Sequence, residues 1–206
     1  MIFVTTRNPG KLREIRDALG ELPVPVAGLE DFPTLPEPAE TGATFAENAR
    51  LKAHYYAQAT GQWCLADDSG LAVDALGGRP GVHSARFAAE RIPPGANRHA
   101  VDHANNQRLL EELAGLAPDQ LTARFLCHLA LSDGRRVLLE AQGALEGLIV
   151  RQGQGHNGFG YDPHFYVPSE GLTLAQMPAA RKNAISHRGQ AVRRLGELLR
   201  ALLARP

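Results

Sequence analysis

Residues Trp63-Cys64-Leu65-Ala66-Asp67-Asp68-Ser69-Gly70 carry more information than any other stretch of this chain. The run Trp63–Ala66 is short and apolar, which is typical of a buried strand. Two adjacent carboxylates, a hydroxyl and a glycine follow, so the sequence predicts that the strand ends there. Strand ends are where α/β proteins place ligands and metals. Two acids at such a position need a compensating positive charge, and a divalent cation bound to a phosphorylated ligand is the obvious candidate.

Length and composition restrict the class of protein. The chain has 206 residues, with 22 Lys and Arg residues balanced by 22 Asp and Glu residues. This length suits one domain with a sizeable core, or two closely joined lobes. Zero net charge argues against a protein that holds nucleic acid or membrane through bulk charge. Because the start has no secretory pattern and no apolar stretch approaches about 18 residues, we expect a cytoplasmic protein.

The two cysteines, Cys64 and Cys127, stand far apart, each inside an apolar run. We expect them to be small core residues in a reducing compartment. They do not have the spacing of a disulfide framework or of a metal-binding pair.

The rest of the chain predicts a mixed α/β fold. Ile2–Thr5 is β-branched and aromatic and predicts a strand, and the apolar spacing over Lys11–Leu19 predicts a helix after a turn. Thr44 and Glu47 form a capping box that opens another helix. We further expect a strand over Leu71–Leu76, a helix over His99–Leu116 and a last helix capped by Ser186.

A hairpin decides the kind of sheet. Two β-rich runs, Leu121–Ser132 and Arg136–Gln142, flank Asp133-Gly134, a strong signal for a tight turn between antiparallel strands. An antiparallel hairpin among strand–helix units argues against a purely parallel, doubly wound sheet.

Two segments could bind phosphate or metal. Asn8-Pro9-Gly10-Lys11 joins a predicted strand to a predicted helix, where backbone N–H groups, the helix dipole and a lysine favour an anion. It is not a Walker A loop, because the required upstream glycine is missing, and a plain turn with a surface lysine is the alternative. Glu40 could join Asp67 and Asp68 around a metal, or could be a solvated acid.

Asn48 and Lys52 are four residues apart and share one helix face. They could line a binding site, but the residues alone favour contact with water.

Gly153-x-Gly155-x-x-Gly158 matches the dinucleotide-binding pattern as a string. That pattern must open a helix, and the segment Phe159-Gly160-Tyr161-Asp162-Pro163 that follows disfavours one. We therefore reject a Rossmann site. The glycines still permit a flat ligand to approach Phe159 closely.

The segment Lys182–Gly189 places two permanent cations, a histidine and a hydroxyl at a predicted helix start. Either an acceptor-rich ligand binds there, or the segment is an ordinary polar cap. His99 and His103 are also four residues apart, but without the glutamate of a zinc protease motif they are expected to lie on the surface.

Taken together, these segments resemble the house-cleaning inosine/xanthosine triphosphate pyrophosphatases. Six collinear pieces spanning residues 2 to about 192 carry the resemblance. They are Thr6–Lys11, Glu40–Ala53, Ala66–Leu71, Pro80–Arg86, Gly158–Pro163 and Ile185–Gly189.

The resemblance implies a single two-lobed α/β domain over residues 1–206, with a long mixed sheet flanked by helices and an active-site cleft between the lobes. It implies Mg²⁺-dependent hydrolysis of ITP, dITP and XTP to the monophosphate and pyrophosphate, which cleanses the nucleotide pool. It also suggests a homodimer, with neither nucleic acid nor membrane as a partner.

The resemblance assigns roles residue by residue. Asp68 is the catalytic carboxylate and a metal ligand, Glu40 is the second ligand, and Asp67 is either a further ligand or an acid behind them. The implied substrate-binding residues are Thr6, Arg7, Asn8, Pro9, Gly10, Lys11, Lys52 and Ser69 for the phosphates, and Phe159, Gly160, Tyr161, Asp162, Lys182, His187 and Arg188 for the base and sugar.

Two other functions stay open at this point. One is a Maf-like pyrophosphatase of modified pyrimidine nucleotides. The other is a module that binds a nucleotide without turning it over, against which the number of metal-competent acids argues.

Overall fold

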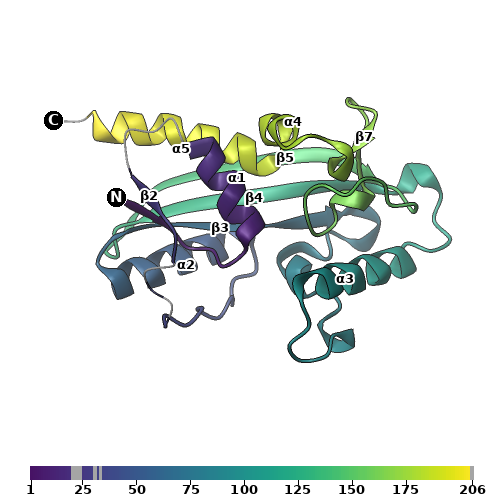
Figure 1. The fold of residues 1–206 in the computed structure, drawn as a ribbon, viewed down its shortest axis with the longest axis horizontal. Coiled ribbons are helices and arrows are strands. Elements are labelled where there is room, and N and C mark those ends of the chain that lie inside the picture. Colours follow the sequence, from purple (N-terminus) through teal and green to yellow (C-terminus); the bar gives the residue numbers. More distant parts are fainter. Residues whose placement is uncertain (20–24, 30–31, 33, 205–206) are drawn as a thin grey trace. The chain divides into compact units, whose positions relative to one another are not determined.

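The computed structural model of the chain describes residues 1–19, 25–29, 32 and 34–204. Its helices and strands are joined by loops and short 3₁₀ segments (Figure 1). The strands are β1 (Ile2–Val4), β2 (Val26–Ala27), β3 (Trp63–Val73), β4 (Thr122–Ser132), β5 (Val137–Ile149), β6 (Phe165–Val167) and β7 (Leu172–Thr173). The α-helices are α1 (Pro9–Leu19), α2 (Phe45–Thr60), α3 (Arg98–Glu112), α4 (Ala179–Ile185) and α5 (His187–Leu203).

Strand β3 is longer than the sequence predicts. The strand does not end at Asp67-Asp68, and Leu71–Leu76 is not a separate strand, because β3 runs without interruption over Trp63–Val73. Only residues 74–76 leave the strand, as a 3₁₀ turn. Charged residues are tolerated within this strand because protein cations meet them, as described below.

The sheet is mixed, as the hairpin predicts. Its strand order is β2-β1-β3-β4-β5-β6-β7. Strand β1 pairs in parallel with both β2 and β3, whereas β6 pairs antiparallel with β5 and β7. The hairpin connecting β4 to β5 closes where the amide of Asp133 donates to the carbonyl of Arg136 at 3.2 Å.

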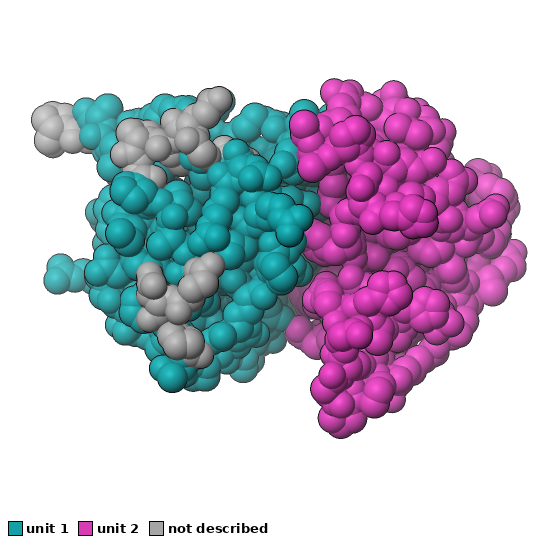
Figure 2. Space-filling model, viewed as in Figure 1, with its two compact units in different colours: residues 1–69, 127–144, 183–206 teal, residues 70–126, 145–182 magenta. Residues whose placement is uncertain are grey.

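The chain divides into two compact units, which Figure 2 colours separately. Unit 1 comprises residues 1–69, 127–144 and 183–206, and unit 2 comprises residues 70–126 and 145–182. Strands β3, β4 and β5 each contribute residues to both units.

Unit 1 buries its part of the sheet under helices on both faces. Helices α1 and α5 pack against each other on one face, and α2 covers the other (Figure 1). Leu65 packs in the α1/α5 core, whereas its neighbours Cys64 and Ala66 pack against α2. Successive side chains of a strand point to opposite faces, so this alternation continues into the acids that follow.

Local signals set the ends of two unit 1 helices. Thr44 and Glu47 form the predicted capping box at the start of α2, and Ser186 accepts from the amide of Gly189 at 3.0 Å at the start of α5. Both caps confirm the sequence prediction. Both cysteines are buried and free, as expected.

Unit 2 has its own core beneath α3. Leu109 and Leu113 from the end of that helix are buried, and the rings of Phe125 and Phe165 lie 4.7 Å apart. A 3₁₀ turn at Asp162–His164, rather than an α-helix, follows the glycine-rich loop. This confirms the rejection of a Rossmann site.

Candidate active site

Helix α1 begins two residues earlier than predicted, at Pro9, and Asn8 caps it. The Asn8 Oδ1 atom accepts from the amides of Gly10 at 2.9 Å and Lys11 at 3.3 Å. The amide of Asn8 itself donates to the hydroxyl of Thr6 at 3.2 Å. The proposed phosphate segment is therefore a capped helix N-terminus, where the helix dipole favours an anion.

Arg7 turns away from this helix start. Its guanidinium donates to the carbonyl of Leu35 at 2.5 Å and lies 3.4 Å from Glu37. The structure thus places this residue against the loop that precedes α2.

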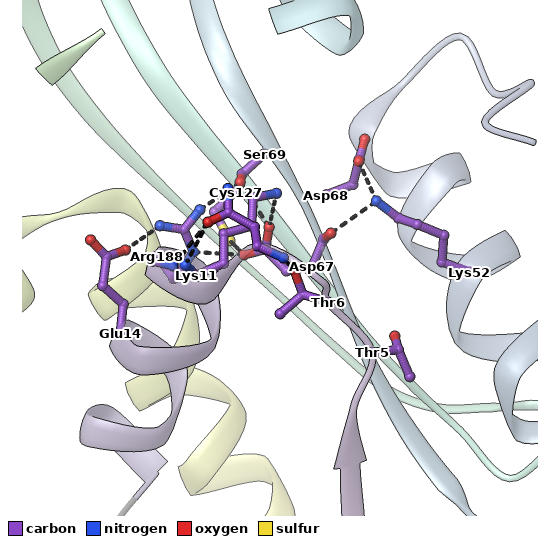
Figure 3. A network of polar contacts seen from close by, with 12 residues as sticks. Thr5, Thr6, Lys11, Glu14, Lys52, Asp67, Asp68, Ser69, Cys127 and Arg188 are labelled. Atoms are coloured by element: carbon purple, nitrogen blue, oxygen red, sulfur yellow. Dashed lines mark hydrogen bonds and ion pairs between the residues drawn. The ribbon is translucent and has the colours of Figure 1, made fainter. Parts of the chain in front are cut away.

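Asp67 is the centre of a buried ionic network on the α1/α5 face (Figure 3). One of its oxygens accepts from Lys11 Nζ at 2.5 Å and from Ser69 Oγ at 2.8 Å. The other accepts from Arg188 Nε at 2.8 Å and from Cys127 Sγ at 3.3 Å. Burial by itself raises the pKa of Asp67, but Arg188 and Lys11 outweigh it and hold that pKa well below the usual range.

Arg188 is only 2% exposed, and its contacts extend the network to α1. Its guanidinium donates to Glu14 and, at 2.7 Å, to the hydroxyl of Ser69. Burial opposes its charge, but Asp67 and Glu14 raise its pKa above the ordinary value. Glu14 was not among the predicted site residues, because only the packing of α1 on α5 brings it to Arg188.

Asp68 lies on the opposite face, against α2 (Figure 3). Lys52 Nζ donates to Asp68 Oδ1 at 2.5 Å, to Glu40 Oε1 at 3.0 Å and to the backbone carbonyl of Asp67 at 2.9 Å. Burial raises the pKa of Asp68 above its usual value, although Lys52 opposes that shift. Its second carboxylate oxygen is buried and has no hydrogen-bond partner within the described part of the chain.

The two acids are thus compensated separately, one by Lys11 and Arg188 and the other by Lys52. Glu40 and Asp68 bind the same lysine, Lys52, whereas the carboxylate of Asp67 binds other cations. Among the described residues no cluster of three or more His, Cys, Asp or Glu side chains could hold a metal ion. The pair Glu40 and Asp68 still offers hard oxygen donors, which suit a small divalent cation that also binds substrate phosphates.

Lys52 and Asn48 do not face water, contrary to the expectation from the residues alone. Lys52 makes the contacts above, and Asn48 is fully buried. The Asn48 Oδ1 atom accepts from the amide of Gly42 at 2.8 Å, which ties the loop after Glu40 to α2. Tertiary burial of this helix face explains the difference, and the spacing of the two residues contained no signal for it.

In unit 2, Phe159, Asp162 and Lys182 form a second cluster. The buried Lys182 Nζ donates to Asp162 Oδ2 at 2.6 Å and lies 4.9 Å from the centre of the Phe159 ring. The amide of Phe159 donates to the same Asp162 oxygen at 2.9 Å. A carboxylate therefore holds an aromatic ring and an ammonium group together, an arrangement suited to a flat, acceptor-bearing ligand.

Three other residues predicted for the base site, Tyr161, His187 and Arg188, are buried. The hydroxyl of Tyr161 donates to the carbonyl of Ser84 at 2.8 Å, and burial raises the pKa of Tyr161. His187 is buried at the first position of α5 in unit 1. Arg188 also belongs to unit 1, where it binds Asp67.

Within the described ranges, none of the helices has the length and apolar character needed to cross a membrane.

Comparisons with known proteins show which family this chain resembles. The model of the Ham1 family matches residues 2–198. A dITP/XTP pyrophosphatase of Nitratidesulfovibrio vulgaris is 51% identical over 96% of this chain and 94% of its own length. One from Listeria monocytogenes is 46% identical over 94% of this chain and 92% of its own length.

Two solved structures of Ham1 proteins are also similar to this chain. A HAM1 protein from Coxiella burnetii is 40% identical and superposes with a TM-score of 0.84, covering 97% of this chain and 98% of that one. The Staphylococcus aureus Ham1 protein superposes with a TM-score of 0.81 at 35% identity, covering 98% and 100% of the two chains. With a family model that matches nearly its whole length and relatives this similar in sequence and structure, the chain belongs to the Ham1 family.

Proposed function

We propose that this chain hydrolyses the non-standard purine nucleotides ITP, dITP and XTP to the monophosphate and pyrophosphate, and so cleanses the nucleotide pool. The observation that carries the proposal is the cluster of Glu40, Lys52 and Asp68, in a chain whose relatives are named dITP/XTP pyrophosphatase. A buried acid and a half-buried acid beside a lysine are groups that metal-assisted hydrolysis of a phosphoanhydride can use.

Mg²⁺ is the proposed cofactor, with Glu40 and Asp68 as its ligands. The buried Asp68 oxygen without a hydrogen-bond partner supports this fit, because a cation supplies the missing interaction. When bound, Mg²⁺ neutralises phosphate oxygens and acidifies a coordinated water. Asp67, saturated by Lys11 and Arg188, has the role of an acid that holds these cations in place rather than of a ligand.

Asp68 is the proposed general base. It orients a water molecule and accepts its proton while the water oxygen forms a bond to the α-phosphorus. The bond from that phosphorus to the oxygen bridging to the β-phosphate breaks, and pyrophosphate leaves with the bonding electrons. Burial raises the pKa of the metal-free Asp68 carboxyl, which is the direction that makes a carboxylate a stronger base.

Phosphate binding is assigned to Thr6 and residues 8–11, together with Lys52 and Ser69, whereas Arg7 binds the loop before α2 in this structure. The capped N-terminus of α1 supports this assignment, since its dipole favours negative charge. Lys11 and Lys52 add positive charge at the two faces of β3.

Base recognition is assigned to Phe159–Asp162 with Lys182, which lie together in unit 2. Hydrogen-bond donors there match the O6 acceptor of hypoxanthine and xanthine. Adenine carries an amino group at that position, which is itself a donor, so with adenine bound the protein donors have no acceptor. A buried donor without its partner costs about 1–3 kcal/mol. We further propose that the protein works in the cytoplasm as a homodimer.

A panel of triphosphates with Mg²⁺ tests the function. We expect ITP, dITP and XTP to release pyrophosphate and the monophosphate far faster than ATP, GTP or a modified pyrimidine triphosphate. Comparable kcat/KM for ATP and ITP overturns the specificity. A preference for modified pyrimidines supports a Maf-like enzyme, and tight binding of ITP without turnover supports a sensing module.

A further inference from the structure

Helix α3 of unit 2 holds the backbone of Gly160 through two side chains. The amide of Gly160 donates to Asp102 Oδ2 at 2.8 Å, and Asn106 Nδ2 donates to the carbonyl of Gly160 at 2.9 Å. Both polar groups of one residue in the glycine-rich loop are thus bonded to one helix. Asp102 and Asn106 are four residues apart, so they share one helix face.

Both side chains are themselves fixed in orientation. Asn106 Nδ2 also donates to the backbone carbonyl of Asp102 at 2.9 Å, and its residue is only 9% exposed. Asp102 forms an ion pair with Arg98 one turn earlier, at 2.9 Å. A side chain restrained in this way can position the group that it binds.

The turn held by α3 is the one that carries Phe159. Gly158 and Gly160 both have positive φ, at 77° and 64°. A Cβ atom on Gly158 would come within 2.0 Å of Asp162 Oδ2, so the turn closes tightly around that carboxylate. Asp162 in turn binds the Phe159 amide and Lys182. Displacement of Gly160 therefore changes the positions of both the ring and the ammonium group.

We infer that Asp102 and Asn106 are positioning residues for purine recognition: they hold the Gly158–Asp162 turn so that Phe159 and Lys182 present one surface to the base. The inference rests on the proposed function for the identity of the ligand. The clamp itself rests on the four hydrogen bonds at Gly160, Phe159 and Asp162. It predicts that losing the clamp weakens contact with the base and leaves contact with phosphate intact.

The test compares the two reaction products as ligands, because IMP contains the base and pyrophosphate does not. In Asn106→Leu we expect the Kd for IMP and the KM for ITP to rise roughly tenfold, the effect of about 1.4 kcal/mol. The Kd for pyrophosphate with Mg²⁺ should stay within about twofold, because that ligand makes no base contact. Asp102→Asn keeps an acceptor for the Gly160 amide and should bind IMP better than Asp102→Ala.

Asn105 provides a matched control. It is the neighbouring buried asparagine on α3, but it bonds to the amide of Ala88 at 2.8 Å and the carbonyl of Ala85 at 3.3 Å instead of to the loop. Asn105→Leu should lower the melting temperature without changing the ratio of the two Kd values. Equal weakening of IMP and pyrophosphate in Asn106→Leu, or the same selective effect in Asn105→Leu, overturns the inference.

Hydrogen exchange of the Gly160 amide, measured without any ligand, separates this inference from the proposed function. Faster exchange in Asp102→Ala and Asn106→Leu, together with weaker IMP binding, supports positioning for the base. Faster exchange with unchanged IMP binding overturns it. If the wild-type protein does not hydrolyse ITP but its binding of IMP still depends on the clamp, the proposed function is wrong and the positioning inference stands.

Discussion

The carboxylates of Asp67 and Asp68, adjacent in sequence, lie on opposite faces of strand β3 and bind different cations. Asp67 meets Lys11 and Arg188 on the α1/α5 face, and Asp68 meets Lys52 on the α2 face (Figure 3). The two acids therefore do not form a crowded pair, and a substitution of each should have a different consequence.

Asp68→Asn should abolish most turnover and leave the fold intact. Loss of the charge removes the proton acceptor, so we expect kcat to fall by about 10²–10³ or more. Lys52 keeps Glu40 as an ionic partner, so the melting temperature should change little. The measurements are kcat, ITP affinity and a melting curve in saturating Mg²⁺. Near-normal turnover in this variant shows that another group is the base.

Asp67→Asn should lower stability more than Asp68→Asn does. Its carboxylate is fully buried between two cations, and removal of one member of a buried ion pair costs about 3–5 kcal/mol. Chemical denaturation of both variants measures the difference in the free energy of unfolding. Asp74→Asn is the control, because it disturbs an exposed ion pair with Arg124, worth at most about 1 kcal/mol, and the asparagine oxygen can still accept from the Thr122 hydroxyl. A stability loss no larger than that of the control contradicts the buried network.

Glu40→Gln should weaken the response to metal specifically. Because the variant loses one ligand of a hard-cation site, the Mg²⁺ concentration that gives half-maximal rate should rise by roughly tenfold. In the wild-type protein, chelation of the metal by EDTA should abolish turnover. Glu37→Gln is the matched control on the same loop, because Glu37 pairs with the exposed Arg7. If both variants respond to Mg²⁺ like the wild type, Glu40 is not a ligand.

Replacing the Lys182–Asp162 pair with neutral side chains should erode base discrimination. Lys182→Met alone leaves Asp162 buried without its ammonium partner, so the informative protein is the double variant Lys182→Met/Asp162→Asn. We expect the ratio of kcat/KM for ITP over ATP to fall by roughly ten- to a hundredfold, as for one lost hydrogen bond to a charged donor. A ratio that stays at the wild-type value assigns discrimination to other residues.

Several features could be predicted from local sequence because short-range physics determines them. The capping box of Thr44 and Glu47, the Ser186 cap and the turn at Asp133-Gly134 all form where the sequence indicates. A helix cap or a tight turn depends on a few neighbouring residues, so its signal is complete within the segment. The grouping of Glu40 with Asp68 came from the resemblance, since the residues alone favoured a solvated acid for Glu40.

Other features depend on contacts between residues far apart in sequence. Strand β3 continues through Asp67-Asp68 because Arg188, 121 positions further along, and Lys11 neutralise a charge that would otherwise end a buried strand. Asn48 is fully buried, where it accepts from the amide of Gly42 in the loop before α2. The sequence by itself determined the family, the local caps and the mixed character of the sheet. Tertiary structure decided which carboxylate binds which cation. The alternation of side chains along the strand and the packing of the helices bring together charges that are far apart in sequence, and no local pattern indicates this.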